Sequence, residues 1–331
     1  MPDMLSWTSF HARLHKTIRQ RSLFSRNQSL LVAVSGGQDS LCLARLLLDL
    51  QPHWGWQIGI VHCNHRWRSD ADANADYVAQ LAQQWQVPVH QKLAEAPIPS
   101  EAAARDWRYQ AMAAIAHEGA YQTVVTGHTA SDRAETLLYN LIRGSGADGL
   151  QSLTWQRPLE SGVQLVRPLL AFTRSETAQL CEERHIHIWD DETNQDLYYA
   201  RNRIRLELMP YLEEAFHSQV EHHLSQTAEL LRADVELLED LASTVRHQAM
   251  HPNAPYDLSR AVLRPTPLAL QRRVIRQFLQ RVLPIAPNFE HIEKVVQLIE
   301  APNRSQTDPM PGGAIAHVED DWIRLKPASP A

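Results

Sequence analysis

Two kinds of hydrophobic pattern alternate over the first half of the chain. Short apolar runs rich in β-branched residues predict buried strands, and longer stretches with apolar residues three and four positions apart predict amphipathic helices. The expected strands are residues 30–34, 58–62, 87–91, 123–127 and 163–169. The expected helices are residues 40–50, 72–85, 101–116, 131–143 and 173–184, the last opened by a capping box of Thr173 and Glu176. This rhythm predicts an α/β domain, a parallel sheet with flanking helices.

The pattern turns helical after about residue 215. Apolar residues recur at helical spacing from Val220 to Val245, which predicts one long linker helix. A Pro-containing break at 251–256 ends it, and further helices are expected at 268–282 and 289–299, followed by a small hairpin around 315–325. The chain is therefore expected to hold an N-terminal helical extension (1–25), the α/β domain (26–215), a linker helix (216–250) and a smaller, mainly helical C-terminal domain (251–331).

The N-terminal segment allows two interpretations. Residues 1–21 are poor in acidic residues and carry several basic ones, as organelle transit peptides do. Leu5, Phe10, Leu14 and Ile18 follow a helical period, which favours an ordinary helix docked on the domain.

Composition narrows the class of protein. The chain has 331 residues, 44% of them hydrophobic, which is enough to bury a large core. It carries 32 Lys and Arg against 38 Asp and Glu, a net charge of −6, so any nucleic-acid contact must use local basic patches. Cys42, Cys63 and Cys181 are too scattered for a disulfide framework or a four-ligand zinc site. No segment reads as a membrane span, and a cytoplasmic location is expected.

A six-residue run lies between the first predicted strand and its helix: Ser35, Gly36, Gly37, Gln38, Asp39 and Ser40. Glycines let backbone N–H groups approach a phosphate there, and the helix N-terminus adds a partial positive charge. The run has no terminal Lys, so it is not a Walker A loop. Asp39 would repel phosphate unless Mg²⁺ bridged the two, which makes it a candidate metal ligand. The alternative is a tight turn with Asp39 or Ser40 as a helix cap.

This run is the signature of the PP-loop ATP pyrophosphatases, and the chain resembles that superfamily. Within it, the chain is similar to the tRNA(Ile)-lysidine synthetases over about residues 26–210. The blocks that carry the likeness are HCNHRWR at 62–68, ARDWRY at 104–109, GHTASDRAET at 127–136, RGSG at 143–146, RPL at 167–169, DETN at 191–194 and RNRIR at 201–205. The sequence departs from the family at Trp67, where Leu is common, and at Glu192, where Pro is common.

The resemblance implies a reaction and its partners. ATP, with Mg²⁺, would activate the wobble cytidine of an isoleucine tRNA with a CAU anticodon by adenylation, and free L-lysine would then displace AMP from carbon 2 to form lysidine. It also implies that residues 26–215 are the ATP-binding catalytic domain and that the C-terminal domain contacts tRNA.

Asp132 and Glu135 are three residues apart at a predicted helix start and hence share one face. Two carboxylates beside a nucleotide need a cation, which we expect to be Mg²⁺ at Asp132 and the ammonium of lysine at both residues. The alternative is that both are helix-start charges stabilised by the helix dipole.

Histidines and arginines complete the expected site. His62 and His128 follow predicted strands and are expected to bond to nucleotide, because no zinc ligand set accompanies His62 and His65. Arg105 and Arg108 lie three apart on a helix, where they can neutralise phosphate in the transition state or simply be exposed. The expected catalytic residues are thus Asp39, Asp132, Glu135 and Arg105.

A basic cluster near residue 200 is the candidate tRNA contact. It contains Arg201, Asn202, Arg203 and Arg205 in a chain of negative net charge, and such a cluster suits RNA phosphates. The alternative is a set of ion pairs to Glu207, Glu213 or Glu214.

Two other functions are compatible with parts of the pattern. A tRNA thiolase of the same superfamily would adenylate a base too, but the sequence has no Cys-x-x-Cys. A regulatory protein that holds ATP without turnover is the second, and the acidic pair together with the arginine clusters argues against it.

Overall fold

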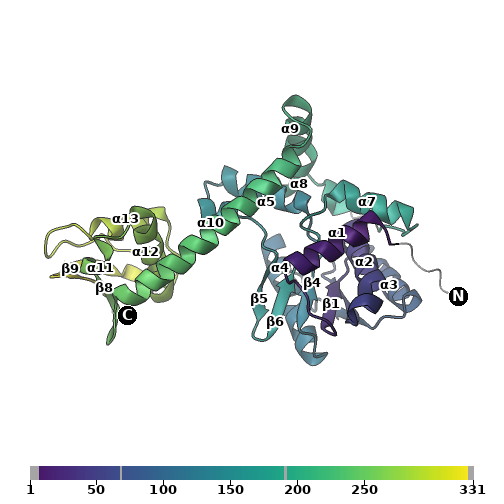
Figure 1. Cartoon of the computed structure of the whole chain (residues 1–331), viewed down its shortest axis with the longest axis horizontal. Helices are drawn as coiled ribbons and strands as arrows, with labels where there is room; N and C mark the ends of the chain where they lie inside the picture. Colours follow the sequence, from purple (N-terminus) through teal and green to yellow (C-terminus); the bar gives the residue numbers. More distant parts are fainter. Residues whose placement is uncertain (1–6, 68, 190–191, 327–331) are drawn as a thin grey trace. The chain divides into compact units, whose positions relative to one another are not determined.

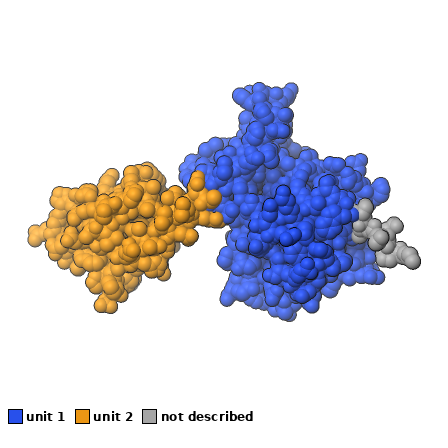
Figure 2. Space-filling model, viewed as in Figure 1, with its two compact units in different colours: residues 1–232 blue, residues 233–331 orange. Residues whose placement is uncertain are grey.

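The computed structural model describes residues 7–67, 69–189 and 192–326. It divides into two compact units, residues 1–232 (unit 1) and 233–331 (unit 2) (Figure 2). Leu5, Arg68 and Asp191 contribute to patterns in the sequence but lie outside the described residues. The four-part division expected from the sequence stays a prediction.

Unit 1 is built on a six-stranded sheet (Figure 1). Its strands are β1 (Ser29–Ala33), β2 (Gln57–Asn64), β3 (Val89–Leu93), β4 (Thr123–Val125), β5 (Gln156–Glu160) and β6 (Val163–Val166). The spatial order is β3-β2-β1-β4-β6-β5, and every neighbouring pair is parallel except β5 with β6. The predicted parallel α/β sheet is therefore confirmed. The order turns around at β1, between β2 and β4, the position at which such sheets bind ligands.

Helices precede, connect and follow these strands. They are α1 (Ser9–Gln20), α2 (Gln38–Trp54), α3 (Ala71–Gln84), α4 (Glu101–Glu118), α5 (Ala130–Ile142), α6 (Ala147–Leu150), α7 (Arg174–Glu183), α8 (Ala200–Arg203) and α9 (Met209–Ala215). A π-helical turn, Ile204–Leu208, joins α8 to α9. The Thr173–Glu176 capping box opens α7 as predicted.

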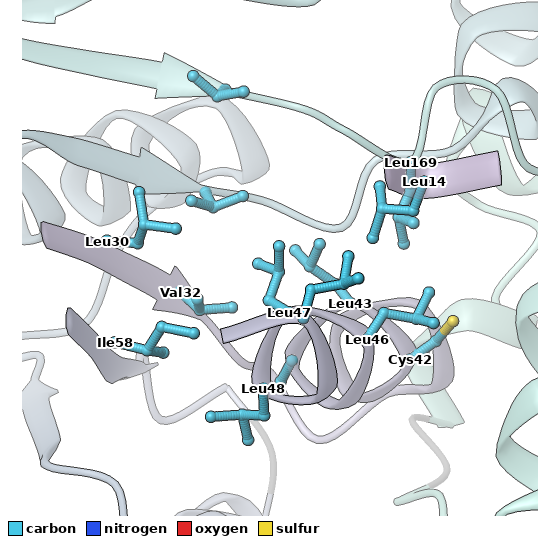
Figure 3. Packing of buried hydrophobic residues seen from close by; sticks show 14 of the residues in the cluster. Leu14, Leu30, Val32, Cys42, Leu43, Leu46, Leu47, Leu48, Ile58 and Leu169 are labelled. Atoms are coloured by element: carbon cyan, nitrogen blue, oxygen red, sulfur yellow. The ribbon is translucent and has the colours of Figure 1, made fainter. Parts of the chain in front are cut away.

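Both faces of the sheet are covered by apolar packing. On β1, Leu30 and Val32 belong to the principal core with α1, α2 and α3 (Figure 3). Leu31, between them, belongs to the core beneath α4. This alternation is the two-residue period of a strand between two layers of helices. Phe10, Leu14 and Ile18 of α1 are buried in the principal core, which confirms the predicted docking of this helix.

Strand β5 was not predicted. Its side chains alternate between exposed and half-buried, it contains Pro158, and it pairs only with β6 at the edge of the sheet. An edge strand of this kind has no buried face and so leaves no hydrophobic period in the sequence. The short helix α6 was not predicted either, and it overlaps a stretch that contains Gly144, Gly146 and Gly149.

The long helix predicted after residue 215 is α10 (Val220–Ala249), and the boundary between the two units falls inside it. Unit 2 contains the short helix α11 (Arg260–Leu263), α12 (Leu268–Val282) and α13 (Phe289–Gln297) with a four-stranded antiparallel sheet of order β7-β8-β10-β9. The strands are β7 (Met250–His251), β8 (Ala254–Ser259), β9 (Ile315–Glu319) and β10 (Trp322–Lys326). Helix α12 has the predicted bounds and β9–β10 is the predicted hairpin. Helix α10 ends at Ala249, directly before the expected break at 251–256, and this segment contains the turn between β7 and β8.

Candidate active site

The turn between β1 and α2 has the shape expected of a phosphate-binding loop. Gly36 has φ +91°, and a Cβ there would lie 2.2 Å from Oδ1 of Asn74. The Ser40 hydroxyl donates to the Gly37 carbonyl oxygen at 2.8 Å and accepts the Ser35 N–H at 3.1 Å. These bonds fix the conformation of the turn at the start of α2. The first N–H groups of this helix have no partner within the helix.

A second loop packs directly against this turn. A Cβ on Gly127, which follows β4, would lie 2.9 Å from the carbonyl carbon of Asp39. Only glycine allows so close an approach. Two residues on, Thr129 caps α5 in a capping box with Asp132. The two motifs singled out in the sequence thus meet at one edge of the sheet.

The acidic pair on α5 is buried and already bonded. One oxygen of Asp132 accepts the N–H and the hydroxyl of Thr129, at 2.8 and 2.9 Å. The other accepts from Arg174 at 3.0 Å and from Arg201 at 2.8 Å. Asp132 is therefore a helix-start charge and a member of an ion cluster at once.

Glu135 is more completely enclosed, with 2% of its side chain exposed. It accepts from Arg174 at 2.7 Å and from Arg201 at 3.2 Å. Arg205 adds two bonds, at 2.9 and 3.1 Å, one to each carboxylate oxygen. The cation expected beside the acidic pair is thus supplied here by the protein's own arginines, and an incoming ammonium would have to displace one of them.

Arg174 was missed in the sequence and lies at the centre of the cluster. Besides Asp132 and Glu135, its guanidinium lies 3.5 Å from a carboxylate oxygen of Asp39. Its main chain is fixed as well: the Gln38 side chain donates to the Arg174 carbonyl oxygen at 2.7 Å, and the Arg174 N–H donates to the Ser131 hydroxyl at 2.9 Å. One residue therefore contacts both the phosphate-binding turn and α5.

Charges in the cluster shift the pKa values of its members. Burial alone would raise the pKa of Asp132, but Arg174 and Arg201 hold it well below its usual range. Burial would raise the pKa of Glu135 too, but the bonds from Arg205 and the charge of Arg174 outweigh burial and lower it. The pKa of Asp39, in contrast, is raised, because burial outweighs its attraction to Arg174. Of the three carboxylates, Asp39 is therefore the one whose charged form would be stabilised most by an added cation.

Asp39 is the residue best suited to hold Mg²⁺. Its other oxygen accepts the hydroxyl of Thr177, so a carboxylate and a hydroxyl oxygen lie together beside the phosphate-binding turn. Mg²⁺ in nucleotide sites commonly takes one or two carboxylates and completes its shell with phosphate and water, which this pair fits. Within the described part of the chain, no group of three or more His, Cys, Asp or Glu side chains is arranged to hold a metal. Asp132 would first have to release an arginine.

Of the two predicted histidines, His128 lies close enough to the cluster for the charges of Asp132 and Arg201 to act on it. His62 is buried at the end of β2 with Nδ1 2.8 Å from the Val34 carbonyl oxygen, and burial lowers its pKa. His128 bonds to the Thr126 hydroxyl at 2.9 Å. Burial lowers the pKa of His128 although the charge of Asp132 opposes this, so the ring is neutral near pH 7.

Arg105 and Arg108 both lie on α4. Arg105 is half-buried, with its guanidinium carbon 5.1 Å from the centre of the Tyr109 ring. Its charge contributes to the lowered pKa of His128. Burial and the neighbouring charge of Arg105 lower the pKa of Arg108. Arg105 is thus near the site but outside the carboxylate cluster.

The candidate tRNA cluster is divided by the fold. Arg201 and Arg205 face the α5 carboxylates, as described. The Asn202 side chain donates to the carbonyl oxygens of Thr193 and Asp196, both at 2.9 Å. Arg203 is exposed and pairs at 3.6 Å with Glu207, one of the partners considered from the sequence. The ion-pair partners of Arg201 and Arg205 are therefore not those that the sequence suggested, because the pairing joins helices far apart in the chain.

Residues that sequence reasoning missed have one feature in common. Arg174 and Thr177 lie in the first turn of α7, which follows the last parallel strand, and Ser131 lies in the first turn of α5. Helices that follow parallel strands begin at the same edge of the sheet. The capping box at Thr173 marked this start in the sequence, so the signal was present.

Comparisons with known proteins agree with this geometry. The PP-loop domain family matches residues 7–212, and the TilS substrate binding domain family matches residues 258–320. The tRNA(Ile)-lysidine synthase of Nostoc sp. is 60% identical over 97% of both chains, and the chloroplastic enzyme of that name from Zygnema circumcarinatum is 35% identical over 86% of this chain and 78% of its own. Among solved structures, the U34-tRNA thiolase NcsA from Methanococcus maripaludis is similar in fold, with a TM-score of 0.56, 18% identity and 67% of this chain and 77% of that chain covered. The chain belongs to the tRNA(Ile)-lysidine synthase family.

Proposed function

We propose that this chain uses ATP to join free lysine to carbon 2 of the wobble cytidine of an isoleucine tRNA with a CAU anticodon. The single observation that carries the proposal is that a phosphate-binding turn and two buried carboxylates of α5 converge on one guanidinium, that of Arg174. Such a site brings an anionic nucleotide and a cationic amine within reach of each other. Family membership supplies the substrate class.

In the first step, O2 of the cytidine attacks the α-phosphorus of ATP, the bond to the β-phosphate oxygen breaks, and pyrophosphate leaves. N–H groups at the start of α2 would bind the phosphates, and the charge of Arg105 would balance the negative charge that develops. Mg²⁺ held at Asp39 would neutralise the departing pyrophosphate. Adenylation turns O2 into part of a good leaving group.

In the second step, Asp132 and Glu135 would bind the lysine ammonium, orient it and influence its loss of a proton to solvent, which leaves a neutral ε-amino group. This amine attacks carbon 2, the carbon–oxygen bond breaks, AMP leaves with that oxygen, and the new C–N nitrogen releases a second proton to solvent. The product has a new carbon–nitrogen bond, so the enzyme is proposed to be a ligase. The wobble base must leave the anticodon stack to reach the pocket.

The remaining parts of the chain have proposed roles in holding RNA. Unit 2 would contact the tRNA, as the match to a substrate binding domain at residues 258–320 suggests. Exposed Arg203 would contact a phosphate. We place the enzyme in the cytoplasm, or in a plastid if the chain shares the setting of its chloroplastic relative. Within the described residues, no helix is long and apolar enough to cross a membrane.

The cysteines argue against sulfur transfer by this chain. Cys42 and Cys181 are buried, and burial raises the pKa of Cys181 to about 12. Burial also raises the pKa of Cys63 to about 11. Thiols of this kind form little thiolate near pH 7, and thiolate is the reactive species.

An Asp39→Asn variant tests the nucleotide half of the proposal. Removing the charge should abolish tRNA-dependent release of pyrophosphate from ATP while leaving the unfolding transition in place, because the amide keeps the shape of the carboxylate. Glu118→Gln, at the exposed end of α4, is the matched control and should release pyrophosphate normally. Normal release by Asp39→Asn would remove the proposed metal role.

A further inference from the structure

We infer that Arg174 moves from the carboxylate cluster to the phosphates of bound ATP, and that this exchange couples nucleotide binding to lysine binding. The inference rests on the proposed function and adds a residue and an order of events to it. It starts from a balance of charge. In the described structure three carboxylates, Asp39, Asp132 and Glu135, face three guanidinium groups, Arg174, Arg201 and Arg205.

A neutral cluster is a poor site for lysine. An ammonium gains little from carboxylates whose oxygens are already bonded, and it must lose its water to enter. Glu135 accepts four N–H bonds from three arginines. The oxygen of Asp132 that does not bond to Thr129 accepts two. Lysine can therefore bind well only after a guanidinium leaves.

Arg174 is the guanidinium best placed to leave. It is the member of the cluster that also reaches Asp39 in the phosphate-binding turn, whereas Arg205 bonds to both oxygens of Glu135. Its side chain is 26% exposed, close to the 28% of Arg201, and its Nε, Nη1 and Nη2 each contact a different carboxylate, so no single carboxylate holds it by two bonds. A phosphate oxygen in the turn would lie next to the group that now contacts Asp39.

The backbone of Arg174 does not have to move. Its carbonyl oxygen accepts from Gln38 and from Thr177, at 2.7 and 2.9 Å, and its N–H donates to Ser131 at 2.9 Å. Ser131 in turn donates to Glu221 of α10 at 2.6 Å. A rotation of the side chain alone would therefore suffice for the exchange, with the start of α7 held in place.

The consequence is positive coupling between the two ligands. ATP would draw Arg174 away, which removes one N–H donor from Asp132 and one from Glu135, and the lysine ammonium can take the place of the guanidinium with the same charge. Linkage requires that lysine then strengthen nucleotide binding by the same factor.

The test is calorimetric titration of L-lysine into the full chain, alone and saturated with α,β-methylene ATP and Mg²⁺. No tRNA is present, so no reaction occurs. We expect the analogue to lower the lysine Kd by at least about fivefold, the lower end of typical couplings, and lysine to tighten analogue binding equally. In Arg174→Gln the coupling should fall below about twofold and analogue binding should weaken by about tenfold or more, since a charge-assisted bond is lost.

Arg13→Gln is the matched control. Arg13 also pairs with a carboxylate of α7, Glu176, but contacts none of the three cluster carboxylates in the described structure, so the coupling should stay native. If Arg174→Gln does not fold, Arg174→Lys replaces it, because one ammonium cannot bond to three carboxylates in this geometry and the coupling should still fall below native.

The outcomes separate the two proposals. A lysine Kd that does not depend on the analogue, or native coupling in Arg174→Gln, would overturn the inference and leave the lysine site standing. Failure of lysine to bind in any state would overturn both.

Discussion

At the residue scale, the site is a set of opposite charges held out of water. Glu135, with 2% of its side chain exposed, is bonded to Arg174, Arg201 and Arg205. Buried ion pairs of this kind add little net stability when complete but cost about 3–5 kcal/mol when one partner is removed. Charge at Glu135 is therefore expected to matter for structure as well as for lysine.

Glu135→Gln separates the lysine step from the nucleotide step. The amide keeps the shape but loses the charge, so lysine transfer should fall at least about tenfold more than tRNA-dependent pyrophosphate release, as expected for loss of a bond to a charged group. Both are measured on one preparation, with radiolabelled lysine and a pyrophosphate assay, after its unfolding transition has been checked. Glu214→Gln, exposed on α9, serves as the control. Equal loss of both activities, or of neither, would show that Glu135 is not in the lysine site.

How far the site could be foreseen differs from residue to residue. Asp39, Asp132 and Glu135 belong to recognisable motifs at helix starts, and the structure brings them to one cluster. Arg174 lies inside the capping box that opens α7, but its role comes from the packing of α7 against α2 and α5, which the local sequence does not reveal. For the same reason the ion pairs of Arg201 could not be predicted from the sequence, because its partners lie 66 and 69 residues away. Its contact with RNA stays a prediction.

At the scale of elements, two turns bring the motifs together. The turn before α2 and the loop before α5 touch at Gly127, where an added Cβ would lie 2.9 Å from both the carbonyl carbon and the carbonyl oxygen of Asp39. Backbone atoms in the first turn of a packed helix cannot easily give way. The position of Asp39 therefore depends on the smallest side chain at residue 127.

Gly127→Ala should push the loop away from α2. We expect a destabilisation of about 1–3 kcal/mol from overpacking, measured by denaturant unfolding, together with weaker binding of α,β-methylene ATP. Gly146→Ala is the control, because a Cβ there meets nothing within 4 Å and the residue has an ordinary φ of −73°. Unchanged stability and unchanged analogue binding in Gly127→Ala would contradict the close contact.

Elements with a buried face were predictable, and those without one were not. Strands β1, β2 and β4 and the long helix α10 follow the apolar runs that predicted them. Edge strand β5 shows only exposed and half-buried positions. Strands β7 and β8 flank a tight turn with a proline and an asparagine, and the turn residues dominated the local signal.

At the scale of the whole molecule, an enzyme of net charge −6 must bind a polyanion. This requires local positive charge that is not already neutralised by the fold. Of the basic residues near position 200, Arg201 and Arg205 form ion pairs with carboxylates of α5. Arg203 has 64% of its side chain exposed. The contact with RNA in this region is therefore expected at Arg203.

Arg203→Gln should weaken tRNA binding and reduce its salt dependence. Loss of one phosphate contact is expected to lower the slope of log K against log salt by about 0.7 for a single strand or about 0.9 for a duplex. Filter binding over a range of salt concentrations measures it, with Arg19→Gln, exposed on α1, as the control. A slope equal to that of the control would assign Arg203 to its ion pair with Glu207 alone.

The proposed reaction consumes ATP to transfer lysine to an isoleucine tRNA. The most direct measurement incubates the full chain with ATP, Mg²⁺, radiolabelled lysine and tRNA(Ile) with a CAU anticodon, and counts label in the tRNA against pyrophosphate and AMP released. The account predicts one lysine incorporated per pyrophosphate and per AMP, with no incorporation when the wobble cytidine is replaced by uridine. Pyrophosphate release that depends on this tRNA but leaves no lysine in it would contradict the account.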